Sequence, residues 1–259
     1  YGIFDPEGKL GQLYLQAGST RRDITALELA QNLATLPLLF EPRTKWHYSR
    51  STDVLGAVIE VAAGKPLDAL LKERIFDPLG MDNTSFYVDQ KMAGLIANPI
   101  HGEMSDPLNV QPMLLGGSGL HSSTEDYVRF ANMLLNRGEY NGVRIIEQAT
   151  LDLMNQKFIG DDVNRDAFFF GEHGDWGLGF HLQPVPGYSN EGPFNIGWQG
   201  IGGTVFIVDP TNNFFMLYMA QVINAPEGTP MDLNLAQQAV YEAMLNEQTS
   251  ALLSLPVLP

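Results

Sequence analysis

The pattern that most constrains the fold of this chain is a pair of β-type runs near its C-terminal end. Residues 202–222 read GGTVFIVDPTNNFFMLYMAQV, in which two runs rich in β-branched and aromatic residues flank Asp-Pro-Thr-Asn-Asn. Such runs around a turn composition predict an antiparallel hairpin. Residues 176–182, WGLGFHL, supply a further strand-like piece. We therefore expect an antiparallel sheet in the last third of the chain.

In most of the sequence before that sheet, hydrophobic residues recur at the spacing of a helix. Residues 23–37 begin with a Thr25–Glu28 capping-box pair and place leucines at helical spacing. The expected helices cover residues 23–37, 51–63, 66–81, 123–137, 147–157 and 231–245, the last able to pack on the sheet. Residues 1–22 read as an irregular surface segment and residues 85–113 as loop. Helices followed by an antiparallel sheet predict a mixed α+β fold in which residues 25–155 form a mostly helical lobe and residues 176–259 the sheet and final helix.

Charge and composition exclude several classes of partner. The net charge of −15 disfavours nucleic acid and anionic lipid, because phosphate groups would be repelled. The absence of cysteine excludes a disulfide framework and a thiolate nucleophile. No apolar run approaches the length of a membrane span. The chain opens on Tyr1 rather than Met, so we expect residues upstream to be absent. The cytoplasm is the expected compartment, with the periplasm and secretion left open.

Metal and cofactor patterns are weak. The five histidines are scattered, and no pair has the spacing of a helical metal site. Asp162, Asn164 and Asp166 alternate as in a calcium loop, but Ala167 occupies the position that needs glycine and His173 the position of the bidentate Glu. We expect a solvated acidic loop here, and no metal or cofactor.

A glycine-rich segment, GWQGIGG at 197–203, has two readings. The glycines can permit a close approach of two backbones at the start of a strand. They can also let a substrate lie directly against the strand edge, which the neighbouring Trp198 favours. Both readings stay open at this point. The segment GGSGL around Ser118 lacks the final glycine of a nucleophile elbow.

Tyr48 lies among polar residues just before the helix at 51–63. With an ordinary pKa of about 10, a tyrosine is a poor base at neutral pH unless cations favour its phenolate. Lys45, His47 and Arg50 are its neighbours in the sequence. Without further pattern, a structural role for this tyrosine is the expected one.

Three blocks of sequence add a specific resemblance. They are residues 40–86 (FEPRTKWHYSRSTDVLGAVIEVAAGKPLDALLKERIFDPLGMDNTSF), 116–146 (GGSGLHSSTEDYVRFANMLLNRGEYNGVRII) and 197–221 (GWQGIGGTVFIVDPTNNFFMLYMAQ). The order and the residue patterns of these blocks closely resemble those of the serine hydrolases of the class C β-lactamase fold. That group includes family VIII carboxylesterases and D-stereospecific peptidases. The resemblance implies that residues 1–259 form the C-terminal major part of one β-lactamase-like domain.

The resemblance also implies roles for site residues. In that family a Ser in a Ser-x-x-Lys motif attacks a carbonyl, and the Tyr of a Tyr-x-Asn motif takes its proton. Carried over, Tyr48 is the catalytic base. Trp198, Gln199 and Gly200 occupy the third motif beside the substrate, and the backbone N–H of Ile201 is an oxyanion donor.

Two departures from the family pattern bear on the substrate. Arg50 stands where the family has the Asn of Tyr-x-Asn, and Trp198 stands where β-lactamases have a Lys. The lost groups contact β-lactam amides or carboxylates, so a small ester is the expected substrate, with Arg50 and Trp198 among the substrate-binding residues. A β-lactamase, a D-aminopeptidase and a non-catalytic protein that binds a peptide or cell-wall fragment remain as alternatives.

A third departure concerns the nucleophile. None of the six lysines has a serine three positions before it, so the sequence contains no Ser-x-x-Lys. Family order puts that motif upstream of Tyr1. We therefore expect an N-terminal fragment of the same protein to be a partner that completes the fold, and we expect this chain alone to be inactive.

Overall fold

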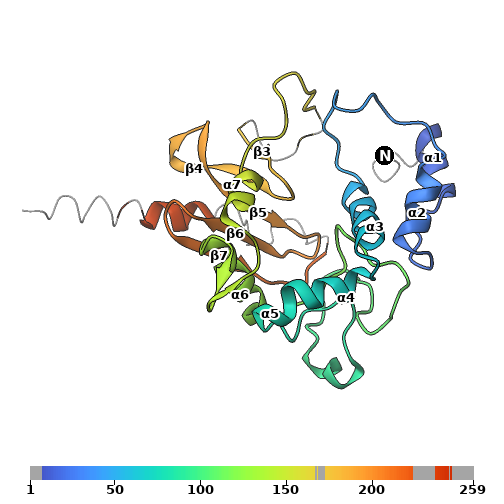
Figure 1. Ribbon diagram of the computed structural model, residues 1–259, viewed down its shortest axis with the longest axis horizontal. Coiled ribbons are helices and arrows are strands. Elements are labelled where there is room, and N and C mark those ends of the chain that lie inside the picture. The colour runs from blue at the N-terminus through green and yellow to red at the C-terminus, as the bar shows by residue number, and fades with distance from the viewer. Residues whose placement is uncertain (1–7, 167, 169–172, 224–236, 245, 247–259) are drawn as a thin grey trace, which may run out of the picture.

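The computed structural model describes residues 8–166, 168, 173–223, 237–244 and 246 (Figure 1). The helices α1, α2 and α3 lie at one end of the molecule, and an antiparallel sheet lies at the other. The expected mixed fold of helices and antiparallel sheet is confirmed.

The sheet has five antiparallel strands in chain order. These strands are β3 (Asp175–Trp176), β4 (His181–Ser189), β5 (Gly192–Gln199), β6 (Val205–Asp209) and β7 (Phe214–Tyr218). The predicted hairpin is therefore β6–β7. Its turn is held by Asp209, whose carboxylate accepts the N–H groups of Thr211 and Asn212 at 2.9 and 3.0 Å. This local hydrogen bonding by an Asp side chain explains why Asp-Pro-Thr-Asn-Asn stops one strand and starts the next.

The helices of the described residues lie within the predicted ranges, with the exception of the first helix and the 3₁₀ helix. They are α1 (Lys9–Gln16), α2 (Ala26–Leu33), α3 (Ser51–Ala63), α4 (Leu67–Leu71), the π-helical turn η1 (Lys72–Phe76), α5 (Asp77–Leu79), the 3₁₀ helix η2 (Gln90–Leu95), α6 (Thr124–Leu135) and α7 (Gln148–Met154). A small hairpin, β1 (Glu139–Tyr140) and β2 (Val143–Arg144), separates α6 from α7. The capping box of α2 is present, since Thr25 Oγ1 accepts the Glu28 N–H and Glu28 accepts the Thr25 N–H. Gly64 ends α3 with φ 63°.

Two expectations for irregular segments were wrong. The segment 1–22 contains helix α1, whose Tyr14 is buried and donates a 3.4 Å hydrogen bond to the carbonyl of Pro37. Burial of one apolar side of this helix outweighed the high glycine content that suggested a loop. The segment 85–113 contains η2, which begins where the Asp89 side chain accepts the Lys91 N–H. Of the helix expected at 231–245, residues 237–244 are helical and the others lie outside the described residues.

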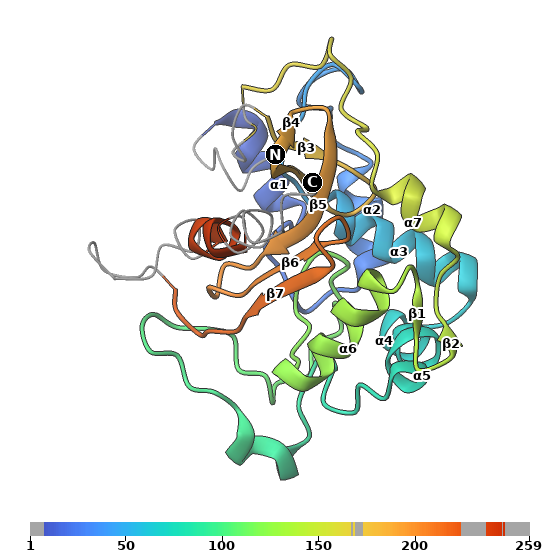
Figure 2. The same ribbon diagram turned by 90° about the vertical axis from the view of Figure 1, so that its left-hand side faces the viewer.

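The apolar side chains gather in two clusters that match the two ends of the molecule. The larger cluster joins the sheet to α6 and to the α4–α5 segment, and it includes Phe180, Leu182, Phe206 and Val208. In Figure 2 α6 lies next to β7, and it contacts both β6 and β7. The smaller cluster, centred on Leu29, packs the α2 region against residues 113–115. The candidate site lies between these clusters, at the start of α3 and the end of β5.

None of the helices in the described part of the chain is both long and apolar enough to cross a membrane.

Candidate active site

Tyr48 and Trp198 lie side by side, although 150 positions of sequence separate them. Their ring centroids are 5.8 Å apart with an interplanar angle of 36°. Tyr48 belongs to the loop that leads into α3, and Trp198 is the second-last residue of β5. The structure thus brings together the first and third sequence blocks that the resemblance singled out.

The loop that carries Tyr48 is held by backbone pairing with a distant segment. The Trp46 N–H donates to the Asn164 carbonyl at 2.9 Å, and the Asn164 N–H donates to the Thr44 carbonyl at 3.0 Å. A turn precedes this pairing, in which the Thr44 N–H donates to the Glu41 carbonyl and Arg43 has φ 69°. Glycine is the residue that usually occupies such a left-handed position. The Tyr48 loop is therefore fixed at both ends, by the pairing with Asn164 and by α3.

Asp53 anchors the start of α3 behind Tyr48. Its carboxylate accepts a hydrogen bond from Arg50 Nη1 at 3.0 Å and another from the Gly117 N–H at 3.0 Å. The Asp53 side chain is only 5% exposed and that of Arg50 only 13%. Gly116 allows this close approach, because a Cβ there would lie 2.0 Å from the Thr52 carbonyl oxygen. Sequence reasoning missed Asp53, whose partner Gly117 lies far along the chain.

The environment of Tyr48 favours the neutral phenol. Burial raises the pKa of Tyr48, the Asp53 carboxylate raises it further, and Arg50 opposes these two effects without reversing them. The guanidinium of Arg50 faces Asp53, which offsets its field. Burial also lowers the pKa of His47, so this neighbour favours its neutral form. The cations close in sequence therefore do not supply the stabilisation that a phenolate needs.

The turn after β5 presents backbone groups next to Trp198. The Gly200 N–H donates to the Thr204 carbonyl at 2.8 Å, and the Gly203 N–H donates to the Gly200 carbonyl at 3.0 Å. Ile201, at the tip, is 85% exposed, and within the described residues its N–H meets no acceptor. An exposed N–H at this point can donate to a ligand. Gln199, the last residue of β5, is also exposed.

Two glycines of this segment make close contacts that a Cβ would obstruct. A Cβ on Gly197 would lie 2.3 Å from the Phe206 carbonyl oxygen, and a Cβ on Gly200 would lie 2.4 Å from Thr204 Oγ1. The first of the two readings of GWQGIGG, a close approach of backbones, therefore holds at Gly197, whereas at Gly200 the close neighbour is a side-chain hydroxyl. It does not exclude a ligand at the exposed tip of the turn.

All three tryptophans of the sequence lie in one row of ring contacts that starts at Tyr48. Trp198 meets Trp176 edge to face, with ring centroids 4.8 Å apart at 87°. Trp176 contacts Trp46 at 6.3 Å, and Trp46 meets Phe168 edge to face at 4.9 Å. We call Trp46, Trp176 and Trp198 the tryptophan row. Trp176 was not among the predicted site residues, and only its place in an aromatic-rich strand signal could have suggested it.

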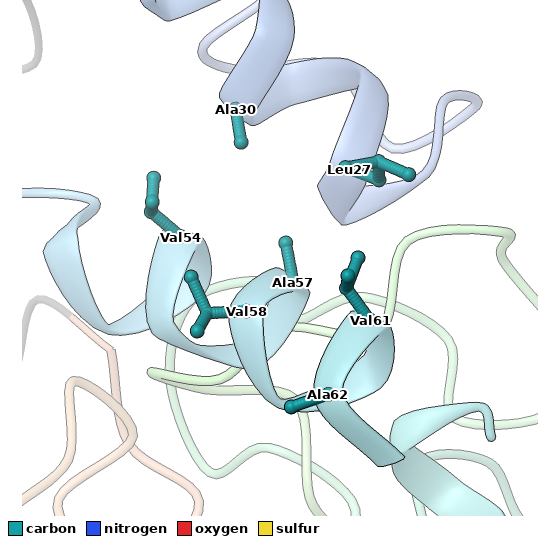
Figure 3. Close-up of a pocket in the computed structure, with 7 residues that line it drawn as sticks. All are labelled: Leu27, Ala30, Val54, Ala57, Val58, Val61 and Ala62. Carbon is teal, nitrogen blue, oxygen red and sulfur yellow. The ribbon is translucent and has the colours of Figure 1, made fainter. Parts of the chain in front are cut away.

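A separate apolar groove of about 290 Å³ lies between α2 and α3 (Figure 3). Its lining is entirely aliphatic and comprises Leu27, Ala30, Val54, Ala57, Val58, Val61 and Ala62. Val58 and Val61 are 57% and 64% exposed. Without a polar or titratable group, this groove can bind apolar side chains but cannot carry out chemistry.

Comparisons with known proteins agree with the fold and the sequence blocks. The family model described as Beta-lactamase matches residues 7–240. Protein Rv1367c of Mycobacterium tuberculosis is 32% identical over 207 residues, which cover 73% of this chain and 52% of that protein. Esterase EstB of Burkholderia gladioli is 24% identical over 273 residues, covering 93% of this chain and 66% of EstB.

Among solved structures, the LovD9 mutant of simvastatin synthase (LovD) from Aspergillus terreus superposes with a TM-score of 0.68 at 21% identity. The match covers 95% of this chain and 66% of the LovD chain. This likeness shows a β-lactamase/transpeptidase-like fold. The chain spans about half the length of the first curated relatives it matches. The family model covers nearly the whole chain, and the protein belongs to the Beta-lactamase family.

Proposed function

We propose that the protein hydrolyses small carboxylic esters through an acyl-enzyme intermediate, with Tyr48 as the general base. The observation that carries this proposal is the position of Tyr48 beside Trp198 and the exposed Ile201 turn. A nucleophilic hydroxyl placed against Tyr48 would attack an ester carbonyl, and the Ile201 N–H would donate to the oxygen on which negative charge develops. Esterase EstB is one relative whose name supports this reaction class.

The raised pKa of Tyr48 means that the base needs a cation from outside the described residues. The described neighbours favour the neutral phenol. A lysine ammonium near the phenol would favour the phenolate, which could then take the serine proton. In this proposal the serine and the lysine come together from a Ser-x-x-Lys helix outside these 259 residues. Residues 1–259 would then be the C-terminal major part of one catalytic domain.

Three features support a docking place for that segment. Strand β7 pairs with β6 and forms one edge of the sheet within the described residues. The groove between α2 and α3 offers an aliphatic surface for a helix. Arg50 Nε is buried, and no acceptor within the described part of the chain meets it. We propose that an apolar helix of that segment packs in the groove.

The ion pair between Arg50 and Asp53 supports an uncharged substrate. The Arg50 guanidinium is paired with Asp53, and Trp198 replaces the lysine that β-lactamases use for a carboxylate. The apolar ring of Trp198 suits an acyl or alcohol group of an ester better than an anion. A β-lactamase or D-aminopeptidase activity is therefore the second candidate among enzymes.

The test measures hydrolysis of p-nitrophenyl acetate and butyrate, with nitrocefin as the β-lactam comparison. The protein from the complete gene and the 259-residue chain are assayed in parallel, each as wild type and as Tyr48→Phe. Tyr188→Phe, an exposed tyrosine of β4, is the matched control. We expect Tyr48→Phe to lower kcat at least a hundredfold and Tyr188→Phe to leave it unchanged. A loss of only a few-fold would refute Tyr48 as the base.

The same experiment separates the remaining alternatives. Nitrocefin turnover above ester turnover would indicate a β-lactamase. Full activity of the 259-residue chain alone would refute the proposed outside nucleophile. If the protein from the complete gene hydrolyses neither substrate, a non-catalytic protein that binds a peptide or cell-wall fragment becomes the better reading, which the raised pKa of Tyr48 would also fit.

A further inference from the structure

Trp176 connects the candidate site to the segment that precedes β3. From the sequence we predicted no functional role for that segment. Trp176 lies on the edge strand β3 and contacts both Trp198 and Trp46 through its ring. An edge-to-face contact at 87° fixes the orientation of both rings more closely than burial alone would. The orientation of Trp198 therefore depends on the position of Trp176.

The position of Trp176 is itself set by a buried ion pair. The Asp175 carboxylate accepts the Trp176 N–H at 2.7 Å and receives Arg165 Nη2 at 2.9 Å. The same Arg165 donates to the carbonyls of Ile159 and Gly174 at 3.0 and 3.2 Å. The Asp175 side chain is only 3% exposed. This network holds the backbone of Trp176 in place against the loop that runs from Ile159 to Asp166.

The charges around the tryptophan row determine what it can bind. Arg50, which acts on Tyr48, and Arg165, which lies over the Phe168 ring, are each paired with a buried aspartate at 3.0 and 2.9 Å. The chain as a whole carries a net charge of −15. An anionic ligand would be repelled and would find both guanidinium groups occupied. The row, half-buried along its length, instead offers ring surface to a neutral, flat group.

We propose that Trp176 is a positioning residue that holds Trp198 for a neutral carbonyl compound with a flat aryl acyl group. This inference rests on the proposed function for the placement of the carbonyl beside Tyr48. Aromatic pairs gain from ring geometry beyond buried area, so an aryl group is favoured over an alkyl group of similar size. Trp176 acts through Trp198 and takes no part in the bond-making steps.

The test measures binding rather than turnover. The protein is labelled with ¹⁵N-tryptophan, and its indole N–H resonances are assigned with single Trp→Phe variants. N-ethylbenzamide and N-ethylbutyramide are the probes, because these neutral amides resemble the esters and are hydrolysed far more slowly. We expect the benzamide to shift the Trp198 and Trp176 resonances together and in a saturable manner, with at least fivefold tighter binding than the butyramide.

Two variants separate positioning from loss of structure. Trp176→Ala should weaken benzamide binding at least fivefold and butyramide binding less than twofold, and Trp176→Phe should restore benzamide binding to within twofold of wild type. An unchanged far-UV circular dichroism spectrum and an unchanged urea midpoint show that the fold is kept. Equal benzamide affinity in wild type and Trp176→Ala, or equal losses in the two variants, would overturn the proposal.

These outcomes are independent of catalysis. A protein that binds the benzamide as expected but hydrolyses no ester would refute the proposed function and leave this inference standing. A protein that hydrolyses esters with the same KM for aryl and alkyl substrates in wild type and Trp176→Ala would refute only this inference.

Discussion

Asp53 offers the sharpest test of how the start of α3 is held. Its buried carboxylate binds Arg50 Nη1 and the Gly117 N–H, both at 3.0 Å. Replacing Asp53 with Ala removes both hydrogen bonds and leaves the Arg50 charge without its partner. Breaking a buried ion pair by deleting one member costs about 3–5 kcal/mol. Because the Arg50 side chain stays 13% exposed and can gain some hydration, we expect a loss of about 2–4 kcal/mol in the free energy of unfolding.

Asp53→Asn separates the two contributions. The Asn side-chain oxygen can still accept the Gly117 N–H, so only the charge is lost, and about half of the effect should remain. The pKa of Tyr48 should fall in both variants, because the negative charge that raises it has gone while Arg50, which lowers it, stays.

Urea denaturation measures the first effect, and NMR titration of ¹³Cζ-labelled tyrosine measures the second. The exposed pair of Arg21 and Asp23, at 2.7 Å, is the matched control, and Asp23→Ala should leave the urea midpoint almost unchanged. A loss below about 0.5 kcal/mol for Asp53→Ala would refute the reasoning, since that is the range of an exposed pair. A Tyr48 pKa that rises in Asp53→Asn would contradict the electrostatic part.

Three further predictions concern pH, backbone conformation and close packing. Burial lowers the pKa of His181 to about 4, so the free energy of unfolding should fall as the pH drops below about 6.5, by up to about 3 kcal/mol near pH 4. Urea titrations at several pH values measure this dependence. His181→Gln should reduce the dependence of stability on pH, and an unchanged dependence would contradict the prediction. Arg43 has φ 69°, so Arg43→Gly should keep the melting temperature or raise it, with a gain in stability of about 1 kcal/mol at most. Arg43→Val should lower the melting temperature. A higher melting temperature for the Val variant than for the Gly variant would disprove strain at this turn. Gly116→Ala would put a methyl group 2.0 Å from a backbone oxygen of α3 and should lower the free energy of unfolding, measured in urea, by about 3 kcal/mol. Gly94→Ala, whose added methyl group meets open space, should change stability by less than about 0.5 kcal/mol. Similar losses for both variants would show that the contact at Gly116 relaxes.

Local signals in the sequence predicted the elements well. The Thr25–Glu28 capping box and the turn at Asp209 act within a few residues, so their structures follow from short-range hydrogen bonds that the sequence displays directly. The helix at Lys9–Gln16 was missed because its stability comes from burying Tyr14 against a distant part of the chain. That burial is a tertiary effect with no local signature.

The candidate site was predicted only where a resemblance joined distant blocks. The residues Tyr48 and Trp198 were singled out together in this way, and the structure places them in contact. The partners that set their environment, Asp53 with Gly117 and Trp176 with Trp198, depend on contacts between remote segments. Electrostatic effects on Tyr48 could not be foreseen for the same reason, because sequence neighbours such as Arg50 are directed to other partners by the fold.

The pairing of the Tyr48 loop with Asn164 has a consequence for the order in which the protein is built. During synthesis, the loop leaves the ribosome well before its backbone partner at Asn164 and before Trp198 on β5. At ordinary elongation rates this delay is on the order of ten seconds. The first part of the candidate site is thus synthesised well before its other half, and the site is assembled only after β5 has left the ribosome.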